Sequence, residues 1–237
     1  MRFPAFFNDI PSLRVRDPLA QALGCAEDGI LEYHYADAVR LVGHSCPTVA
    51  AAYWLTWLAL HELYGDATPE RGGVRVEMRY DPRTGCNGVV ATIIQMLTGA
   101  AGGTGFKGFN GRFSRVGLQR LAPDLPMSLR FTRMDTRDAV DATSMLSMVP
   151  ADPQMEELAA RCGTSRNQPD DWAALGRYWQ RTVQTMLLEL AHDPGVFIVQ
   201  RVDRVERHRW MATRLSAESP PPAGAAAPLR RVCDSGS

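Results

Sequence analysis

The most apolar segment of the chain runs from Val49 to Leu60 and begins just after Pro47. It is shorter than the ~18 or more residues that a bilayer crossing requires, so we expect a buried helix instead. Proline is favoured at the first helical position, because its missing N–H would have no partner there. Glycine commonly follows the last helical turn. The sequence therefore predicts a core helix over about residues 47–64, ended by Gly65, with Cys46 as its N-cap.

A histidine and two cysteines stand in turns that lead into predicted helices. His44 and Cys46 follow Gly43, which we expect to end a short helix, and Cys86 follows the turn 81–85 and leads into a second apolar helix. A helix N-terminus favours negative charge, so a cysteine there tends towards the thiolate. Imidazole and thiolate are zinc ligands, and a site with three protein ligands keeps one position open. We predict that His44, Cys46 and Cys86 bind zinc or another transition metal.

The same residues permit other interpretations. An isolated His-x-Cys is commonly a buried thiol and a solvent-facing histidine in a plain turn. Cys46, with His44 close by, is also a candidate catalytic thiol of a metal-free enzyme. A haem or other tetrapyrrole is a further alternative, with His44 or a cysteine as axial ligand and Tyr53, Trp54 and Trp57 lining the pocket. Those three aromatic residues are equally well explained as core.

The hydrophobic pattern predicts a mixture of strands and helices. Apolar and charged residues alternate in 74–80, which is typical of a half-buried strand. We expect its inward-facing side chains to be Val74, Val76, Met78 and Tyr80. Further strands are expected at 113–119 and 127–133, as an antiparallel pair, and at 195–202, and helices at 31–42, 86–99, 139–149, 154–161 and 169–192. The predicted fold class is α+β, with an antiparallel or mixed sheet packed against helices.

Three regions follow from this pattern. Residues 1–30 contain three prolines and are expected to form an irregular N-terminal arm with one helical turn near 19–23. Residues 31–215 are expected to form the α+β domain. Residues 216–237 are rich in proline and alanine, so we expect a disordered tail that has nothing to bury.

Composition narrows the choice of partners. The 26 basic and 26 acidic residues cancel to a formal charge of zero, so we expect neither nucleic acid nor a membrane as a partner. Five scattered cysteines do not resemble a disulfide framework, and the N-terminus lacks the apolar segment of a secretory signal. We therefore expect a cytoplasmic protein with reduced thiols. The glycine-rich segment 99–111 is either a flexible connector or a loop whose N–H groups approach an anionic ligand.

Together, these motifs resemble the FmdE family of formylmethanofuran dehydrogenase components over about residues 35–115. The resemblance rests on Gly-His-Ser-Cys-Pro at 43–47 before a long apolar helix, and on Cys86 before a helix that ends in Gln-Met-Leu-Thr-Gly at 95–99 and a glycine-rich loop. The residues Val42, Thr48 and Ala100 depart from the family pattern.

The resemblance implies an α+β domain, usually a homodimer, that binds zinc or a similar ion through His44, Cys46 and Cys86. Its expected function is that of a metal-binding accessory enzyme or a metal- or cofactor-handling factor, with a small molecule or cofactor as its ligand. Haem binding and a thiol enzyme that uses Cys46 remain the alternatives.

Overall fold

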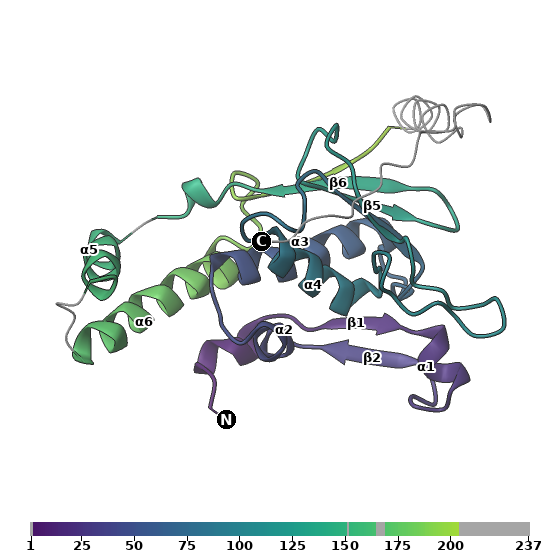
Figure 1. Ribbon diagram of the computed structural model, residues 1–237, viewed down its shortest axis with the longest axis horizontal. Coiled ribbons are helices and arrows are strands. Elements are labelled where there is room, and N and C mark those ends of the chain that lie inside the picture. The colour runs from purple at the N-terminus through teal and green to yellow at the C-terminus, as the bar shows by residue number, and fades with distance from the viewer. Residues whose placement is uncertain (1, 151, 165–168, 204–237) are drawn as a thin grey trace, which may run out of the picture. The chain divides into compact units, whose positions relative to one another are not determined.

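The computed structural model describes residues 2–150, 152–164 and 169–203. A five-stranded sheet in the order β4-β3-β5-β6-β7 packs against the helix α3 (Pro47–Tyr64), and α4 (Asn87–Thr98) packs against α3 (Figure 1). Its strands are β3 (Val74–Met78), β4 (Gln119–Leu121), β5 (Leu129–Arg133), β6 (Ala139–Ser144) and β7 (Phe197–Arg201). Only the β3–β4 pair is parallel among the described strands. The predicted α+β class is confirmed.

The two faces of the sheet differ in chemistry because side chains alternate along each strand. Val76 lies opposite Phe131, and Phe131 lies opposite Val140, and all three are fully buried in the core. On the other face Arg130 donates two hydrogen bonds to Asp141, at 2.6 and 2.7 Å. One face therefore packs on α3 and completes the apolar core. On the other face a buried ion pair links β5 to β6.

The helix α3 begins and ends where the sequence predicts, with Cys46 as N-cap and Gly65 as C-cap. Tyr53 and Trp54 of this helix are fully buried in the core, and Trp57 is partly buried and packs against it. Each of their polar atoms has a partner: Tyr53 Oη donates to the Pro11 carbonyl at 2.8 Å, and the indole N–H groups of Trp54 and Trp57 donate to Ala191 O at 2.6 Å and Ser12 O at 3.0 Å. The core interpretation is confirmed for Tyr53 and Trp54, and Trp57 packs against that core.

The N-terminal segment is ordered, so the prediction of an irregular arm over 1–30 is wrong. A 3₁₀ helix η1 (Ala5–Asp9) precedes β1 (Leu13–Arg16), which pairs antiparallel with β2 (Ile30–Tyr33). Between the two strands lies α1 (Pro18–Ala22), at the position of the expected helical turn. Leu13 and Val15 are buried in the main core, and this long-range burial gives the segment its structure.

The helix predicted over 31–42 is shorter, because its first residues belong to β2. The helix α2 runs over Tyr35–Val42, and His34 and Asp37 form a capping box at its start. Such a box satisfies N–H groups that the first helical turn leaves without partners. Gly43 ends α2 with φ at +81°, as expected for the residue after a helix.

Three other sequence predictions are wrong. Residues 139–144 form β6, not a helix, because they pair with both β5 and β7, and only Leu146–Met148 is helical, as the 3₁₀ helix η2. The strand expected at 113–119 begins only at Gln119, and it pairs with β3 instead of with β5. Tyr80 lies beyond the end of β3 and is 51% exposed, whereas Val74, Val76 and Met78 are buried as predicted.

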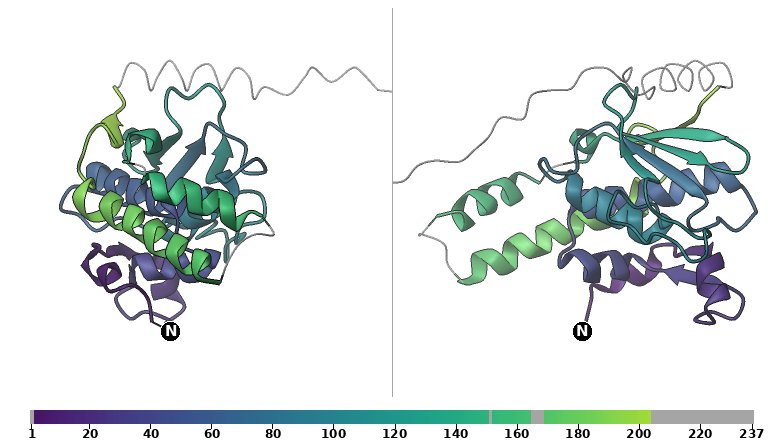
Figure 2. Two further views of the ribbon diagram at one scale, coloured as in Figure 1. Left: turned by 90° about the vertical axis from the view of Figure 1, so that its left-hand side faces the viewer. Right: turned by 45° about the vertical axis from the view of Figure 1, so that its right-hand side comes forward.

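After β6 the chain forms two helices, which lie side by side (Figures 1 and 2). They are α5 (Pro153–Cys162) and α6 (Pro169–Gln184), and the π-helical segment η3 (Thr185–Glu189) continues α6. Both helices agree with prediction. The expected domain boundary at residue 215 and the tail 216–237 lie outside the described residues. None of the helices in the described part of the chain combines the length and apolar character that a membrane crossing needs.

Candidate functional site

The turn before α4 is held by its own polar side chains. Asp81 Oδ1 accepts from the backbone N–H of Arg83 at 2.9 Å, and the Arg83 guanidinium donates to Asp81 Oδ2 at 2.6 Å. These hydrogen bonds lower the pKa of Asp81 to about 2. The amide of Asn87 donates to Thr84 O at 2.9 Å and ties the turn to the first residue of the helix. Cys86, between turn and helix, is thereby presented as an exposed thiol.

Cys86 lines a pocket that lies between α3, the start of α4 and the ends of β3, β5 and β6. The pocket encloses about 220 Å³, and we call it the thiol pocket. Most of its wall is apolar, as is usual for sites that bind small organic molecules. The apolar wall includes Ala51, Ala52, Leu55, Met78, Val90 and Leu129.

A few polar groups converge on this apolar space. Thr48 lies on the first turn of α3, and Ser128 and Ser144 lie at the ends of the sheet strands. Ser128 shares a hydrogen bond of 2.7 Å with Thr143. Thr48, Cys86 and Ser144 have no side-chain hydrogen bond to any residue that the structure describes. They are therefore available to a ligand.

The close approach of α4 to the preceding turn depends on Gly88. A Cβ atom at this position would lie 2.9 Å from the carbonyl oxygen of Pro82, which is closer than real Cβ contacts. The oxygen belongs to the backbone, so it cannot move aside without moving the turn. A glycine at position 88 thus allows the turn to hold Cys86 at the pocket wall.

The predicted metal ligands have different surroundings. Cys46 is the N-cap of α3 and is 9% exposed, whereas His44 is exposed, with its Nδ1 atom 3.1 Å from the Val42 carbonyl oxygen. Of the three predicted ligands only Cys86 lines the thiol pocket. Within the described residues no group of three or more His, Cys, Asp or Glu side chains is placed to hold a metal ion. The donor set as it stands does not fit a three-ligand site, and zinc binding by His44, Cys46 and Cys86 stays a prediction.

Sequence reasoning finds one residue of the pocket and misses most of the others. Cys86 is marked by its position before a helix. Thr48, Ser128 and Ser144 are short polar residues at element ends, and nothing in their local sequence marks them. They come together only because the sheet order brings the ends of β3, β5 and β6 next to the start of α3.

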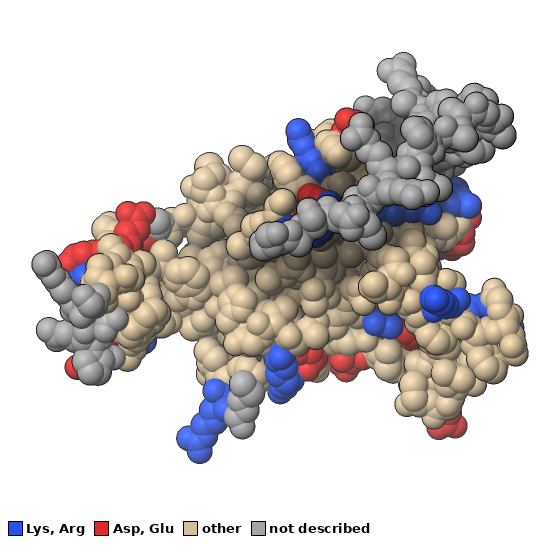
Figure 3. Space-filling view, viewed as in Figure 1, with Lys and Arg blue, Asp and Glu red and all other residues tan. Residues whose placement is uncertain are grey.

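Basic and acidic side chains are interspersed on the face that Figure 3 presents. The formal charge of zero agrees with this mixture. The expectation that the chain does not bind nucleic acid stays a prediction, as does the expected homodimer.

No protein-family model matches this chain, and no curated protein matches it. The resemblance to the FmdE family therefore stays a prediction that rests on the motifs at residues 43–47 and 86–99.

Proposed function

We propose that this chain is a binding domain for a small, largely apolar molecule, which lies in the thiol pocket beside Cys86. The single observation that carries the proposal is the pocket itself, with apolar walls and a few convergent polar groups. Its volume of about 220 Å³ lies below the ~300–1,000 Å³ usual for drug-sized ligands, so the ligand is small.

The polar groups suggest how such a ligand is oriented. The hydroxyl groups of Thr48 and Ser144 can each donate and accept a hydrogen bond, which suits a ligand with one hydroxyl or carbonyl group. Cys86 adds a soft nucleophile to the wall. The thiolate form of a cysteine is the one that attacks disulfides and electrophilic carbon.

Disulfide capture of small fragments at Cys86 tests this proposal. In this exchange the Cys86 thiolate attacks a fragment disulfide, forms a mixed disulfide and releases the other half as a thiol. We expect apolar aryl fragments to be captured at Cys86 in preference to polar fragments of equal size. Cys25 is exposed and does not line the thiol pocket, so it serves as the internal control.

Ala51→Leu supplies the matched variant, because the larger side chain would fill the pocket from α3. We expect it to abolish the apolar preference at Cys86 and to leave capture at Cys25 unchanged. Peptide mapping by mass spectrometry measures both sites in one sample. Equal fragment preferences at Cys86 and Cys25 in the unmodified chain would rule out a binding pocket.

Zinc binding is the second candidate, and it needs His44 and Cys46 to move towards Cys86, because these residues as they stand do not form a three-ligand site. One observation favours it: Thr48, two residues after Cys46, and Cys86 line the same pocket, so the starts of α3 and α4 face a common space. Elemental analysis of the chain beside Cys46→Ser and Cys86→Ser tests it. Bound metal that is lost from both variants supports the site. Absence of metal from the unmodified chain, or equal metal in all three proteins, contradicts it, and a Soret band would instead indicate haem.

A further inference from the structure

A second pocket shares no lining residue with the thiol pocket. It lies where the end of β1, the segment before β3 and the loop after α4 meet, and it encloses about 460 Å³. We call it the arginine pocket, because Arg16, Arg71, Arg112 and Arg115 all line it. Among the described residues, Glu70 is the one carboxylate on its wall.

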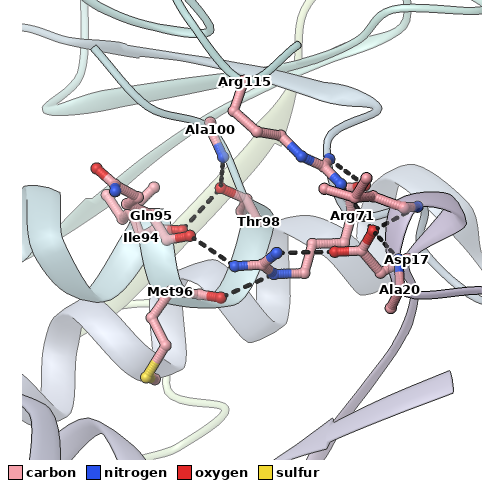
Figure 4. Close-up of polar contacts among 10 residues, drawn as sticks. Asp17, Ala20, Arg71, Ile94, Gln95, Met96, Thr98, Ala100 and Arg115 are labelled. Atoms are coloured by element: carbon pink, nitrogen blue, oxygen red, sulfur yellow. Dashed lines mark hydrogen bonds and ion pairs between the residues drawn. The ribbon is translucent and has the colours of Figure 1, made fainter. Parts of the chain in front are cut away.

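Two of these arginines are fixed around a buried carboxylate (Figure 4). Asp17 is 3% exposed and accepts hydrogen bonds from Arg71 Nη1 at 2.8 Å and from Arg115 Nη2 at 2.7 Å. Arg71 Nε also donates to the Met96 carbonyl at 3.0 Å, at the end of α4, and Arg115 Nη1 donates to the carbonyl of Arg71. Both guanidinium groups are therefore held in place before any ligand arrives.

The charges around Asp17 do not balance. Burial by itself raises the pKa of Asp17, but the hydrogen bonds and charges of Arg71 and Arg115 outweigh it and lower the pKa below its ordinary value. Asp17 is thus ionised at neutral pH. One negative charge faces two positive charges, so Asp17, Arg71 and Arg115 together place a net charge of about +1 at the pocket wall.

The other two arginines are exposed. Arg16 Nη2 donates to Gln21 Oε1 at 2.8 Å, and the Arg112 guanidinium lies 5.1 Å from the centre of the Phe113 ring. Neither forms an ion pair with a carboxylate of the described residues. With Glu70 included, the six charged groups in and behind the pocket comprise four arginines and two carboxylates, which gives a net charge of about +2.

The local sequence is adapted to this arrangement. A Cβ atom at Gly72 would lie 1.1 Å from Arg115 Nη1, and Gly72 also has φ at +87°. Only glycine allows Arg115 to pass this point and reach Asp17. Arg112 directly follows the glycine-rich segment 99–111, for which the sequence leaves an anion-binding role open, and Arg115 comes three residues later.

We propose that the arginine pocket binds a small phosphorylated molecule. Planar guanidinium groups match the oxygens of phosphate in paired hydrogen bonds. A phosphate monoester carries ≈ −1.5 to −2 charges at pH 7, which complements the net charge of the pocket. The volume of about 460 Å³ exceeds what a phosphate group alone fills, so the ligand carries an organic part that can contact Phe113.

Isothermal titration calorimetry tests this assignment, with adenosine 5′-monophosphate, inorganic phosphate and the dicarboxylate succinate as probes. We expect the monophosphate to bind more tightly than succinate. Arg16→Gln and Arg112→Gln should each weaken its binding by about tenfold or more, because each removes hydrogen bonds between a charged donor and the phosphate. Arg14→Gln is the matched control for Arg16→Gln. Arg14 is exposed on β1, the strand that also holds Arg16, but it does not line the pocket.

Thermal unfolding of each variant confirms that it is folded, and both substituted arginines are exposed, so we expect little loss of stability. The proposal is overturned if no phosphate probe binds the unmodified chain at millimolar concentration. It is equally overturned if Arg16→Gln and Arg112→Gln bind the monophosphate as well as Arg14→Gln does. If succinate binds as tightly as the monophosphate, the assignment of the ligand as a phosphorylated molecule is overturned.

Discussion

The turns that lead into α3 and α4 share one local pattern and differ in their surroundings. In both a cysteine is the N-cap, Cys46 before α3 and Cys86 before α4, and in neither does the thiol bond to the helix N–H groups. Cys46 is buried in the core cluster, whereas Cys86 is exposed at the wall of the thiol pocket. Local sequence therefore determines where each helix starts, and tertiary packing determines which thiol can react.

The contacts of the turn before α3 explain why Cys46 is buried. Tyr35 Oη and Ser45 Oγ share a hydrogen bond of 2.9 Å, and Gln180 donates from α6 to the Ser45 carbonyl at 3.2 Å. Two other helices thus fix the residue that precedes Cys46. Among the described residues, the hydrogen bonds that hold the turn before α4 run within the turn and to Asn87, the first residue of the helix. The Cys86 thiol therefore stays open to solvent.

The largest expected difference between the two turns is in alkylation rate. We expect iodoacetamide to modify Cys86 at least about a hundredfold faster than Cys46, because a buried thiol reacts only after a local opening that costs several kcal/mol. Peptide-level mass spectrometry over a time course measures both rates. In concentrated urea the two rates should become similar, and a ratio near one in the native protein would contradict the burial of Cys46.

Serine substitution should change the stability of the protein differently at Cys46 and at Cys86. Cys46→Ser places a hydroxyl in the core, where its oxygen can accept from the first N–H groups of α3 but its own O–H must be buried, so we expect it to lower the free energy of unfolding by about 1 kcal/mol. Cys86→Ser should stay within about 0.5 kcal/mol of the unmodified chain, as is usual for exposed positions. Urea titration measures both, and an equal loss in the two variants would be inconsistent with this contrast.

Alanine substitution of one glycine at each turn should produce different defects. Gly43→Ala meets no atom within 4 Å but requires a positive φ, so we expect a cost of about 1 kcal/mol and unchanged reactivity at Cys86. Gly88→Ala would push against the Pro82 carbonyl, while alanine favours the helix itself by ~1 kcal/mol. We therefore expect little change in stability and a severalfold change in the alkylation rate of Cys86. If Gly43→Ala alters that rate more than Gly88→Ala does, the two turns are not independent.

The smallest effect concerns pH. The pKa of Asp81 is lowered to about 2 by Arg83, so the ion pair contributes fully above the ordinary pKa of ~3.9 and is lost as the pH falls through about 2. Asp81 and Arg83 are accessible to solvent, and we expect almost no effect on global unfolding. NMR titration of the Asp81 carboxyl should give a pKa near 2, and Arg83→Gln should return it towards 3.9. A normal pKa in the unmodified chain would show that the turn is not held in this way.

Features that depend on local sequence were predicted well. The start of α3 at Pro47, the Gly43 and Gly65 caps and the start of α4 after Cys86 follow from backbone preferences of single residues, and all are confirmed. Features that depend on distant partners were not. Residues 139–144 carry no decisive strand pattern, and they form β6 because Arg130 and the strands on both sides pair with them.

The candidate sites follow the same division. Cys86 could be identified from its position before a helix, but its pocket needs Ser128 and Ser144, whose proximity is set by the sheet order. The arginine pocket joins Asp17 to Arg115 across 98 positions of sequence. Gly72 does not stand out in the sequence, and its role becomes clear only when Arg115 is in place.

The most direct test of the central claim, that the thiol pocket binds a small apolar group beside Cys86, is a ratio of two alkylation rates. The aryl haloketone phenacyl bromide is compared with iodoacetamide at Cys86 and at the exposed control Cys25 in the same molecules. We predict that the preference for the aryl reagent is about tenfold or more larger at Cys86, because a bound aryl group raises the effective concentration of the reagent at the thiol. Equal preferences at the two cysteines would contradict the account.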